Sequence, residues 1–88
     1  MAEHISNAGN TLVPAYLALQ SKGYQVWWER GESAPDDEIW FAKGPLGDFS
    51  AEDAVELLGL VTMREVRGPE WQATDEQIDE FMAKYDSN

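Results

Sequence analysis

The residues that could carry catalysis are few in this chain of 88 amino acids. His4 is the only histidine, no cysteine is present, and His4 lies in a polar stretch next to the N-terminus. General acid–base catalysis needs a group held against a fixed neighbour, and a nucleophilic serine needs a base beside it. The sequence therefore predicts no catalytic residue and a protein that is not an enzyme.

Three consecutive acids, Asp36, Asp37 and Glu38, form a cluster whose oxygens could bind a divalent cation. Calcium loops of the EF-hand type need an oxygen ligand at position five and a glycine at position six. Counting from Asp36 puts Trp40 and Phe41 at those positions, so the pattern fails. We therefore predict no metal and no cofactor. A small metal-binding or enzymatic domain that uses this acidic loop is the alternative.

Two tryptophans stand out because of their places in predicted strands. Side chains alternate between the two faces of a strand, so Trp27 and Glu29 share one face. If Glu29 pairs with Glu38 across the intervening loop, Trp27 and Trp40 stack across the strands on the polar face of the sheet. Exposed tryptophans are frequent anchors of protein interfaces. The alternatives are a helix that covers this face, a register that differs by one, and a peptide or small-molecule site on the same aromatic face.

The charge of the chain is strongly negative and unevenly distributed. The formal net charge is −11, to which residues 29–56 contribute −7, residues 70–88 contribute −5 and residues 57–69 contribute +1. Binding nucleic acid through its phosphates needs a basic surface, so that function is excluded. A focused negative field would steer a basic protein partner, although the same acidity could serve solubility alone. The residues predicted to bind such a partner are Trp27, Trp40, Glu29, Asp36, Asp37, Glu38, Asp79 and Glu80.

The elements that position these residues are predicted in the order α-β-β-β-α-α. This order makes an α+β domain in which a three-stranded antiparallel meander packs with three helices. Aromatic and β-branched residues mark the strands, and apolar residues three and four positions apart mark the helices. The predicted helices cover residues 12–22, 51–67 and 75–85, and the predicted strands cover residues 24–30, 38–43 and 48–50.

Two helix starts carry patterns that resemble a capping box, in which two side chains three residues apart satisfy the first backbone N–H groups. Ser50 with Asp53 predicts the start of the second helix, and Thr74 with Gln77 predicts the start of the third. Gly59 is unfavourable inside a helix and therefore predicts close packing at that point. A second helix that stops at this glycine, followed by a fourth strand, is the alternative.

The domain is expected to cover residues 11–85, after a flexible tail over residues 1–10. No apolar run reaches the roughly 18–20 residues of a membrane span, and the N-terminus lacks the pattern of a signal peptide. We therefore expect a cytoplasmic protein without a membrane partner. The sequence does not predict its oligomeric state. The residues expected in the core are Leu12, Tyr16, Leu19, Val26, Trp28, Phe41, Leu58, Val61, Ile78 and Phe81.

The order α-β-β-β-α over residues 11–67 resembles the double-stranded RNA-binding domain in topology. That family places lysines at the start of its last helix to hold phosphates, whereas this chain has Ala51, Glu52 and Asp53 there. The resemblance therefore does not extend to RNA binding. In size, acidity and its aromatic hairpin the chain is similar to small bacterial immunity, antitoxin and inhibitor proteins, which implies a non-enzymatic protein that neutralises a basic partner.

Overall fold

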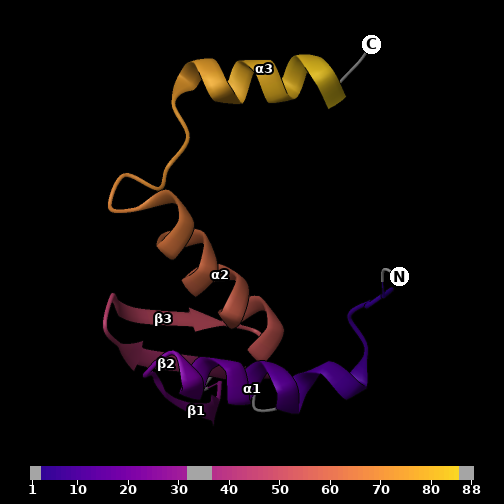
Figure 1. Ribbon diagram of the computed structural model, residues 1–88, viewed down its shortest axis with the longest axis vertical. Helices are drawn as coiled ribbons and strands as arrows, with labels where there is room; N and C mark the ends of the chain where they lie inside the picture. Colours follow the sequence, from indigo (N-terminus) through magenta and orange to yellow (C-terminus); the bar gives the residue numbers. More distant parts are fainter. Residues whose placement is uncertain (1–2, 32–36, 86–88) are drawn as a thin grey trace.

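The computed structural model describes residues 3–31 and 37–85, and its elements follow the predicted order (Figure 1). After a 3-10 turn, η1 (Gly9–Thr11), come α1 (Leu12–Ser21), β1 (Gln25–Arg30), β2 (Glu38–Gly44), β3 (Gly47–Ala51), α2 (Ala54–Arg67) and α3 (Asp75–Tyr85). The strands form one antiparallel sheet in the order β1-β2-β3. The predicted α+β fold is confirmed, and α2 continues as a helix past Gly59.

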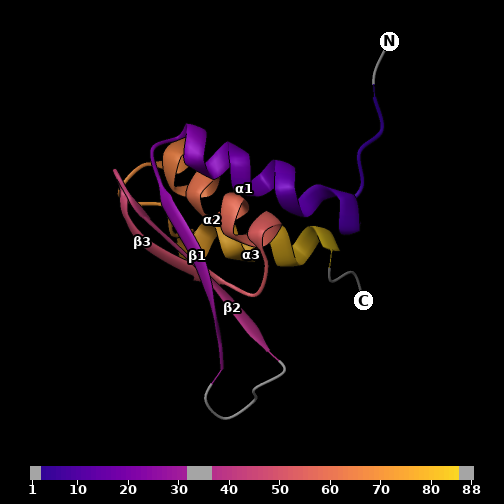
Figure 2. The same cartoon turned by 90° about the horizontal axis from the view of Figure 1, so that it is seen from below.

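Helices α1 and α2 lie side by side on one face of the sheet (Figure 2). Together with the sheet they form a two-layer unit that we call the body, residues 9–31 and 37–67. The two helices run parallel, since Leu12 and Ala54 near their N-terminal ends line one pocket. Near their C-terminal ends, Lys22 Nζ lies 2.6 Å from Glu65 Oε1. The body thus has one face of the sheet covered by helices and one face left open.

The core of the body depends on small side chains as much as on large ones. Four of the nine buried residues in the described chain are alanines, which lets the helices approach the sheet closely. The buried residues are Ala15, Leu19, Tyr24, Trp40, Ala42, Ala51, Ala54, Leu57 and Val61. Alanines contribute little apolar area, so Leu19, Leu57 and Val61, the largest side chains that are fully buried, supply much of the hydrophobic stabilisation.

The predicted strand register is wrong by one residue. Glu38 lies opposite Arg30 instead of Glu29, and Trp40 lies opposite Trp28. Because side chains alternate with a period of two, a shift of one residue turns every side chain of β2 to the other face. The observed register replaces two opposed glutamates with an arginine–glutamate pair, which is favourable across neighbouring strands. It also places Trp40 in the core.

The predicted core is correct in part. Leu19 and Val61 are fully buried, and Tyr16, Val26, Phe41 and Leu58 are partly buried. Leu12, Trp28, Ile78 and Phe81 are exposed, against the prediction. Trp28 has the predicted orientation towards the helix side, but the end of the β1–β2 hairpin extends beyond the helices, as Figure 2 shows. The indole therefore remains 44% exposed, with the Arg30 guanidinium 5.7 Å from its ring centroid.

Helix α2 begins later than Ser50 predicts. Ser50 belongs to β3, where it lies opposite Phe41, and Asp53 is the residue that caps the helix. A carboxylate oxygen of Asp53 accepts the backbone N–H of Glu56 at 2.8 Å, and Glu56 Oε1 accepts that of Glu52 at 3.2 Å. The reciprocal cap therefore exists, but it is displaced by three residues because pairing in the sheet takes precedence at Ser50.

Gly59 does not mark the close packing that its position predicts. A Cβ atom added to Gly59 would meet nothing within 4 Å, because the residue is on the exposed side of α2. Gly68, by contrast, has a positive φ of 83° and ends α2 by donating its N–H to the Arg64 carbonyl at 2.9 Å. This is the usual role of glycine after a helix.

The turn between β2 and β3 is held against the start of β1 by Tyr24. The backbone N–H of Leu46 donates to the Tyr24 hydroxyl at 3.2 Å. The ring also lies so close to Gly44 that a Cβ there would come within 2.7 Å of Tyr24 Cδ2. Glycine is required at this position. The contact fixes the end of the sheet that holds the β2–β3 turn, opposite the end of the β1–β2 hairpin.

Helix α3 begins as predicted but packs differently. Thr74 Oγ1 accepts the N–H of Gln77 at 3.2 Å, and Gln77 Oε1 accepts the N–H of Thr74 at 2.9 Å, so the capping box is confirmed. Arg67 at the end of α2 donates to the Trp71 carbonyl at 2.9 Å and orders the connection. Helix α3 has no buried residue and lies apart from the sheet (Figure 1).

Candidate functional site

The uncovered face of the sheet, which we call the outer face, is built by the alternate residues of three strands. Its three rows, read across the strands, are Glu29–Ile39, Trp27–Phe41–Ser50 and Gln25–Lys43–Asp48. Apolar side chains occupy the centre, while charged and polar side chains surround them. An apolar centre with polar surroundings is also typical of protein interfaces.

Trp27 and Phe41 form the centre of the outer face. Their rings are stacked, with centroids 5.4 Å apart and an interplanar angle of 18°. Trp27 Nε1 donates a hydrogen bond of 2.9 Å to Glu29 Oε2, which holds the indole in one orientation and keeps a carboxylate beside it. Trp27 remains 36% exposed and Ile39 37% exposed, so the apolar surface is accessible.

The end of the hairpin adds acidic side chains next to this surface. Gly31 donates its N–H to the Asp37 carbonyl at 3.0 Å, which brings the two sides of the hairpin together. Asp37 is exposed there, just before β2, and Glu38 is exposed on the helix side of the hairpin, opposite Arg30. The guanidinium of Arg30 lies 5.7 Å from the Trp28 ring centroid, on the helix side of the hairpin. Acidic groups therefore outnumber basic ones at this end.

Trp40 does not belong to the outer face, and this corrects the predicted tryptophan pair. It is 7% exposed and contributes to the core, whereas Phe41 takes the place opposite Trp27. The strand Ile39-Trp40-Phe41-Ala42 is apolar on both faces, so alternation within β2 could not identify the exposed aromatic residue. The signal that could have found Phe41 is the charge pairing of Arg30 with Glu38.

The other predicted partner-binding residues are not brought together. Asp79 and Glu80 are exposed on α3, which does not pack on the sheet, so they form a second acidic surface. Asp36 lies outside the described residues. Within residues 3–31 and 37–85, no group of three or more histidines and carboxylates is placed to hold a metal ion.

Comparisons with known protein families, curated proteins and solved structures found no match to this chain. Within the described part of the chain, no helix combines the length and apolar composition needed to cross a membrane.

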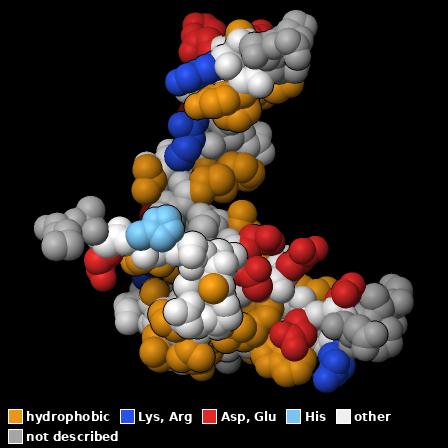
Figure 3. Space-filling model, turned by 90° about the vertical axis from the view of Figure 1, so that its right-hand side faces the viewer, with side chains coloured by type: hydrophobic (Ala, Val, Ile, Leu, Met, Phe, Trp, Pro, Cys, Tyr) orange, Lys and Arg blue, Asp and Glu red, His pale blue; other side chains and the backbone are white. Residues whose placement is uncertain are grey.

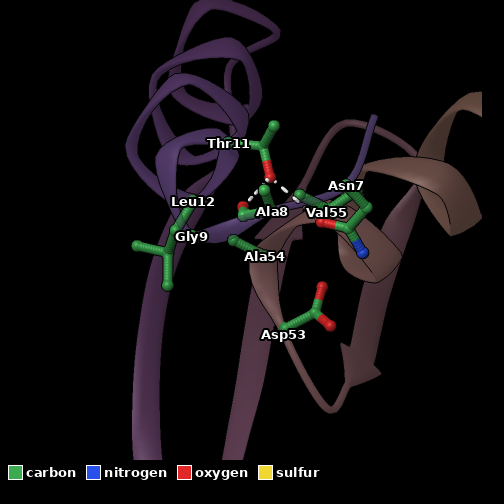
Figure 4. A pocket seen from close by; sticks show the side chains of 8 residues that line it. All are labelled: Asn7, Ala8, Gly9, Thr11, Leu12, Asp53, Ala54 and Val55. Atoms are coloured by element: carbon green, nitrogen blue, oxygen red, sulfur yellow. Dashed lines mark hydrogen bonds between the residues drawn. The ribbon is translucent and has the colours of Figure 1, made fainter. Parts of the chain in front are cut away.

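A pocket of about 160 Å³ lies between η1 and the start of α2 (Figure 4). The Thr11 hydroxyl in its wall lies 2.6 Å from the Ala8 carbonyl oxygen and 3.0 Å from Asn7 Oδ1. The carboxylate of Asp53 is engaged in capping α2. The polar groups in this wall thus serve the local fold, and the outer face is the better candidate site.

Proposed function

We propose that the chain is a small non-enzymatic interaction protein that binds a basic protein through the outer face of its sheet. The observation that carries this proposal is the stacked pair of exposed Trp27 and partly buried Phe41, on a sheet face without a helix and bordered by Glu29. Burying such a pair under a partner would supply hydrophobic free energy at the centre of the contact. The acids at the hairpin end would select a basic partner and speed its approach.

The mode of action fits an immunity-like, antitoxin-like or inhibitor-like protein, which works by covering a partner's surface. Such a role requires rigid placement of a few anchors and no reacting group. The hydrogen bond from Trp27 to Glu29 fixes the principal anchor before binding, so little side-chain entropy remains to be lost. We propose that it acts in the cytoplasm, the location expected from a sequence without an apolar run of membrane-span length or a signal-peptide pattern.

Affinity capture from the cells that express the protein tests this proposal. Partners retained by the wild type at low salt should be released as the salt concentration rises, because exposed charges are screened. Trp27→Ala should raise the dissociation constant roughly 30-fold, the effect of losing an interface anchor worth about 2 kcal/mol. Glu29→Gln should reduce the salt sensitivity of binding.

Trp71→Ala is the matched control, since Trp71 is 40% exposed in the connection between α2 and α3 and lies beside Phe49 and Leu60 rather than beside the Trp27–Phe41 pair. It should retain the same partners with unchanged affinity. Equal loss of binding in Trp27→Ala and Trp71→Ala, or retention of partners by Trp27→Ala, would contradict the proposed surface. Circular dichroism of each variant checks that the fold is preserved.

A further inference from the structure

Helix α3 presents an apolar stripe that nothing in the described chain covers. Ile78 and Met82 are 48% exposed, Phe81 60% and Tyr85 67%. These residues fall at i, i+3, i+4 and i+7, so they share one side of the helix. Helices of about this length are marginal in water without a packing surface. The stripe therefore needs an apolar counterpart.

The chain as a whole exposes far more surface than its mass requires. Its accessible surface is 7042 Å², whereas a compact monomer of 9.9 kDa exposes about 5200 Å². Its radius of gyration is 15.8 Å, against about 12 Å for a compact chain of this length. The exposed residues 3–8 account for part of the excess. The difference, about 1800 Å², exceeds the roughly 800 Å² that each partner gives to a standard interface.

The body offers a surface that matches the stripe. A groove of about 430 Å³ runs between α1 and β1, and its walls include Leu12, Val13, Tyr16 and Trp28. Val13 is 58% exposed and Trp28 44% exposed. Figure 3 shows hydrophobic side chains on one side of α3 and a second group at the opposite end of the molecule, where α1 and β1 lie in Figure 1.

The α1 wall of this groove carries no charge that would repel α3, and Glu29, which is bonded to Trp27, is the acid beside the β1 wall. Helix α3 carries four acids and one lysine, so its net charge is −3. Helix α1 has no charged residue between Leu12 and Ser21, and it is the only described helix of α1, α2 and α3 without one. An acidic helix can therefore approach α1 without facing acidic side chains of that helix.

The connection directs α3 away from the groove of its own chain. The groove lies at the N-terminal end of α1, which is beside the N-terminal end of α2, while α3 leaves from the C-terminal end of α2. The 14 residues of α2 separate these ends by about 21 Å. Arg67 holds the connection through the Trp71 carbonyl, and its guanidinium lies 3.5 Å from Gln77 Oε1 at the start of α3.

We infer that two copies of the chain associate by reciprocal exchange, with the apolar stripe of α3 from each copy seated in the α1–β1 groove of the other. The contact is isologous, so a twofold axis relates the copies and closes the assembly as a dimer. Trp27 borders this groove as well as the outer face, but Phe81 and Val13 belong to the exchange alone. The two proposals can therefore be tested by different substitutions.

Sedimentation equilibrium over a wide concentration range tests the exchange. The wild type should form dimers, and Phe81→Asp in the stripe or Val13→Asp in the groove should raise the dimer dissociation constant at least tenfold. Val66→Asp is the control, since Val66 is 79% exposed on α2 and lies outside both surfaces. It should leave the constant within twofold. A wild type that stays monomeric, or a Phe81→Asp variant that dimerises like the control, overturns the inference.

Cross-linking separates exchange between copies from closure within one chain. The chain has no cysteine, so introduced thiols are unique. A Val13→Cys chain mixed with a Met82→Cys chain should give a covalent heterodimer with a short bismaleimide, whereas Val66→Cys mixed with Met82→Cys should give at least tenfold less. A chain carrying both Val13→Cys and Met82→Cys that cross-links only within itself, together with no heterodimer from the mixture, would show that α3 folds back on its own groove.

Discussion

Helices α2 and α3 have the same local features, but the apolar side of α2 is buried and that of α3 is exposed. Each begins with a reciprocal cap, and each carries apolar residues along one side. Leu57 and Val61 of α2 are fully buried, whereas every apolar residue of the α3 stripe is about half exposed or more. The spacing of residues decides which side of a helix is apolar. What covers that side depends on where the preceding connection places the helix.

The connections explain the difference. Helix α2 follows β3 after only two residues, Glu52 and Asp53, so it must lie over the adjacent face of the sheet. Helix α3 follows a seven-residue connection, over residues 68–74, which Arg67 holds in place. A short connection transmits the position of one element to the next, and a longer one allows the next helix to find a surface elsewhere.

The largest expected contrast is between two large-to-small substitutions, one in α2 and one in α3. Leu57→Ala should lower the free energy of unfolding by about 2–5 kcal/mol, because it leaves a cavity at a fully buried site. Phe81→Ala should change it by less than about 0.5 kcal/mol, because Phe81 is exposed in the single chain. Urea unfolding at the lowest protein concentration that fluorescence allows checks this, since contacts between copies contribute least there.

A loss in Phe81→Ala comparable to that in Leu57→Ala, and independent of protein concentration, would mean that α3 packs on the body of its own chain. A loss in Phe81→Ala that grows with protein concentration would instead agree with exchange between copies. The contrast therefore tests whether the two helices differ in their surroundings as described.

The sequence predicted the elements of this fold well because each has a local cause. Thr74 and Gln77 cap α3 as their spacing predicts, and Gly68 ends α2. The strand register had no such local cause, since β2 is apolar on both faces and only the cross-strand partner decides which aromatic residue is buried. For the same reason Trp27 could be placed on the outer face by its alternation with Glu29, whereas Phe41 could not.

The sequence also did not predict how α3 packs. Its stripe was correctly predicted, but burial of Ile78 and Phe81 was inferred as if an apolar side must face the core of the same chain. Similarly, Gly59 predicted close packing and faces open space. Both errors assign a tertiary contact from a local pattern, and the contact depends on the whole arrangement of the chain.

A smaller contrast is expected between the two helix caps. Asp53→Ala removes the carboxylate that accepts the Glu56 N–H and should lower the free energy of unfolding by about 1 kcal/mol. Thr74→Ala removes an equivalent bond to Gln77 but should leave global unfolding nearly unchanged, because α3 does not support the body. It should instead reduce the helix content of the native protein, measured by circular dichroism. Equal losses of stability in the two variants would contradict this independence of α3.

The smallest effects concern helix propensity at exposed positions, and they test the same independence without touching a side-chain bond. Gly59→Ala should raise the free energy of unfolding by about 0.5–1 kcal/mol, because alanine fits the open space and restricts the unfolded chain. The reverse change in α3, Ala83→Gly, carries the same intrinsic cost but should appear as lost helix content with little change in the urea midpoint. Hydrogen exchange distinguishes the two cases, since local opening of α3 should accelerate exchange there while α2 exchanges only on unfolding of the body. If Ala83→Gly shifted the urea midpoint as far down as Gly59→Ala shifts it up, α3 would belong to the same cooperative unit as α2.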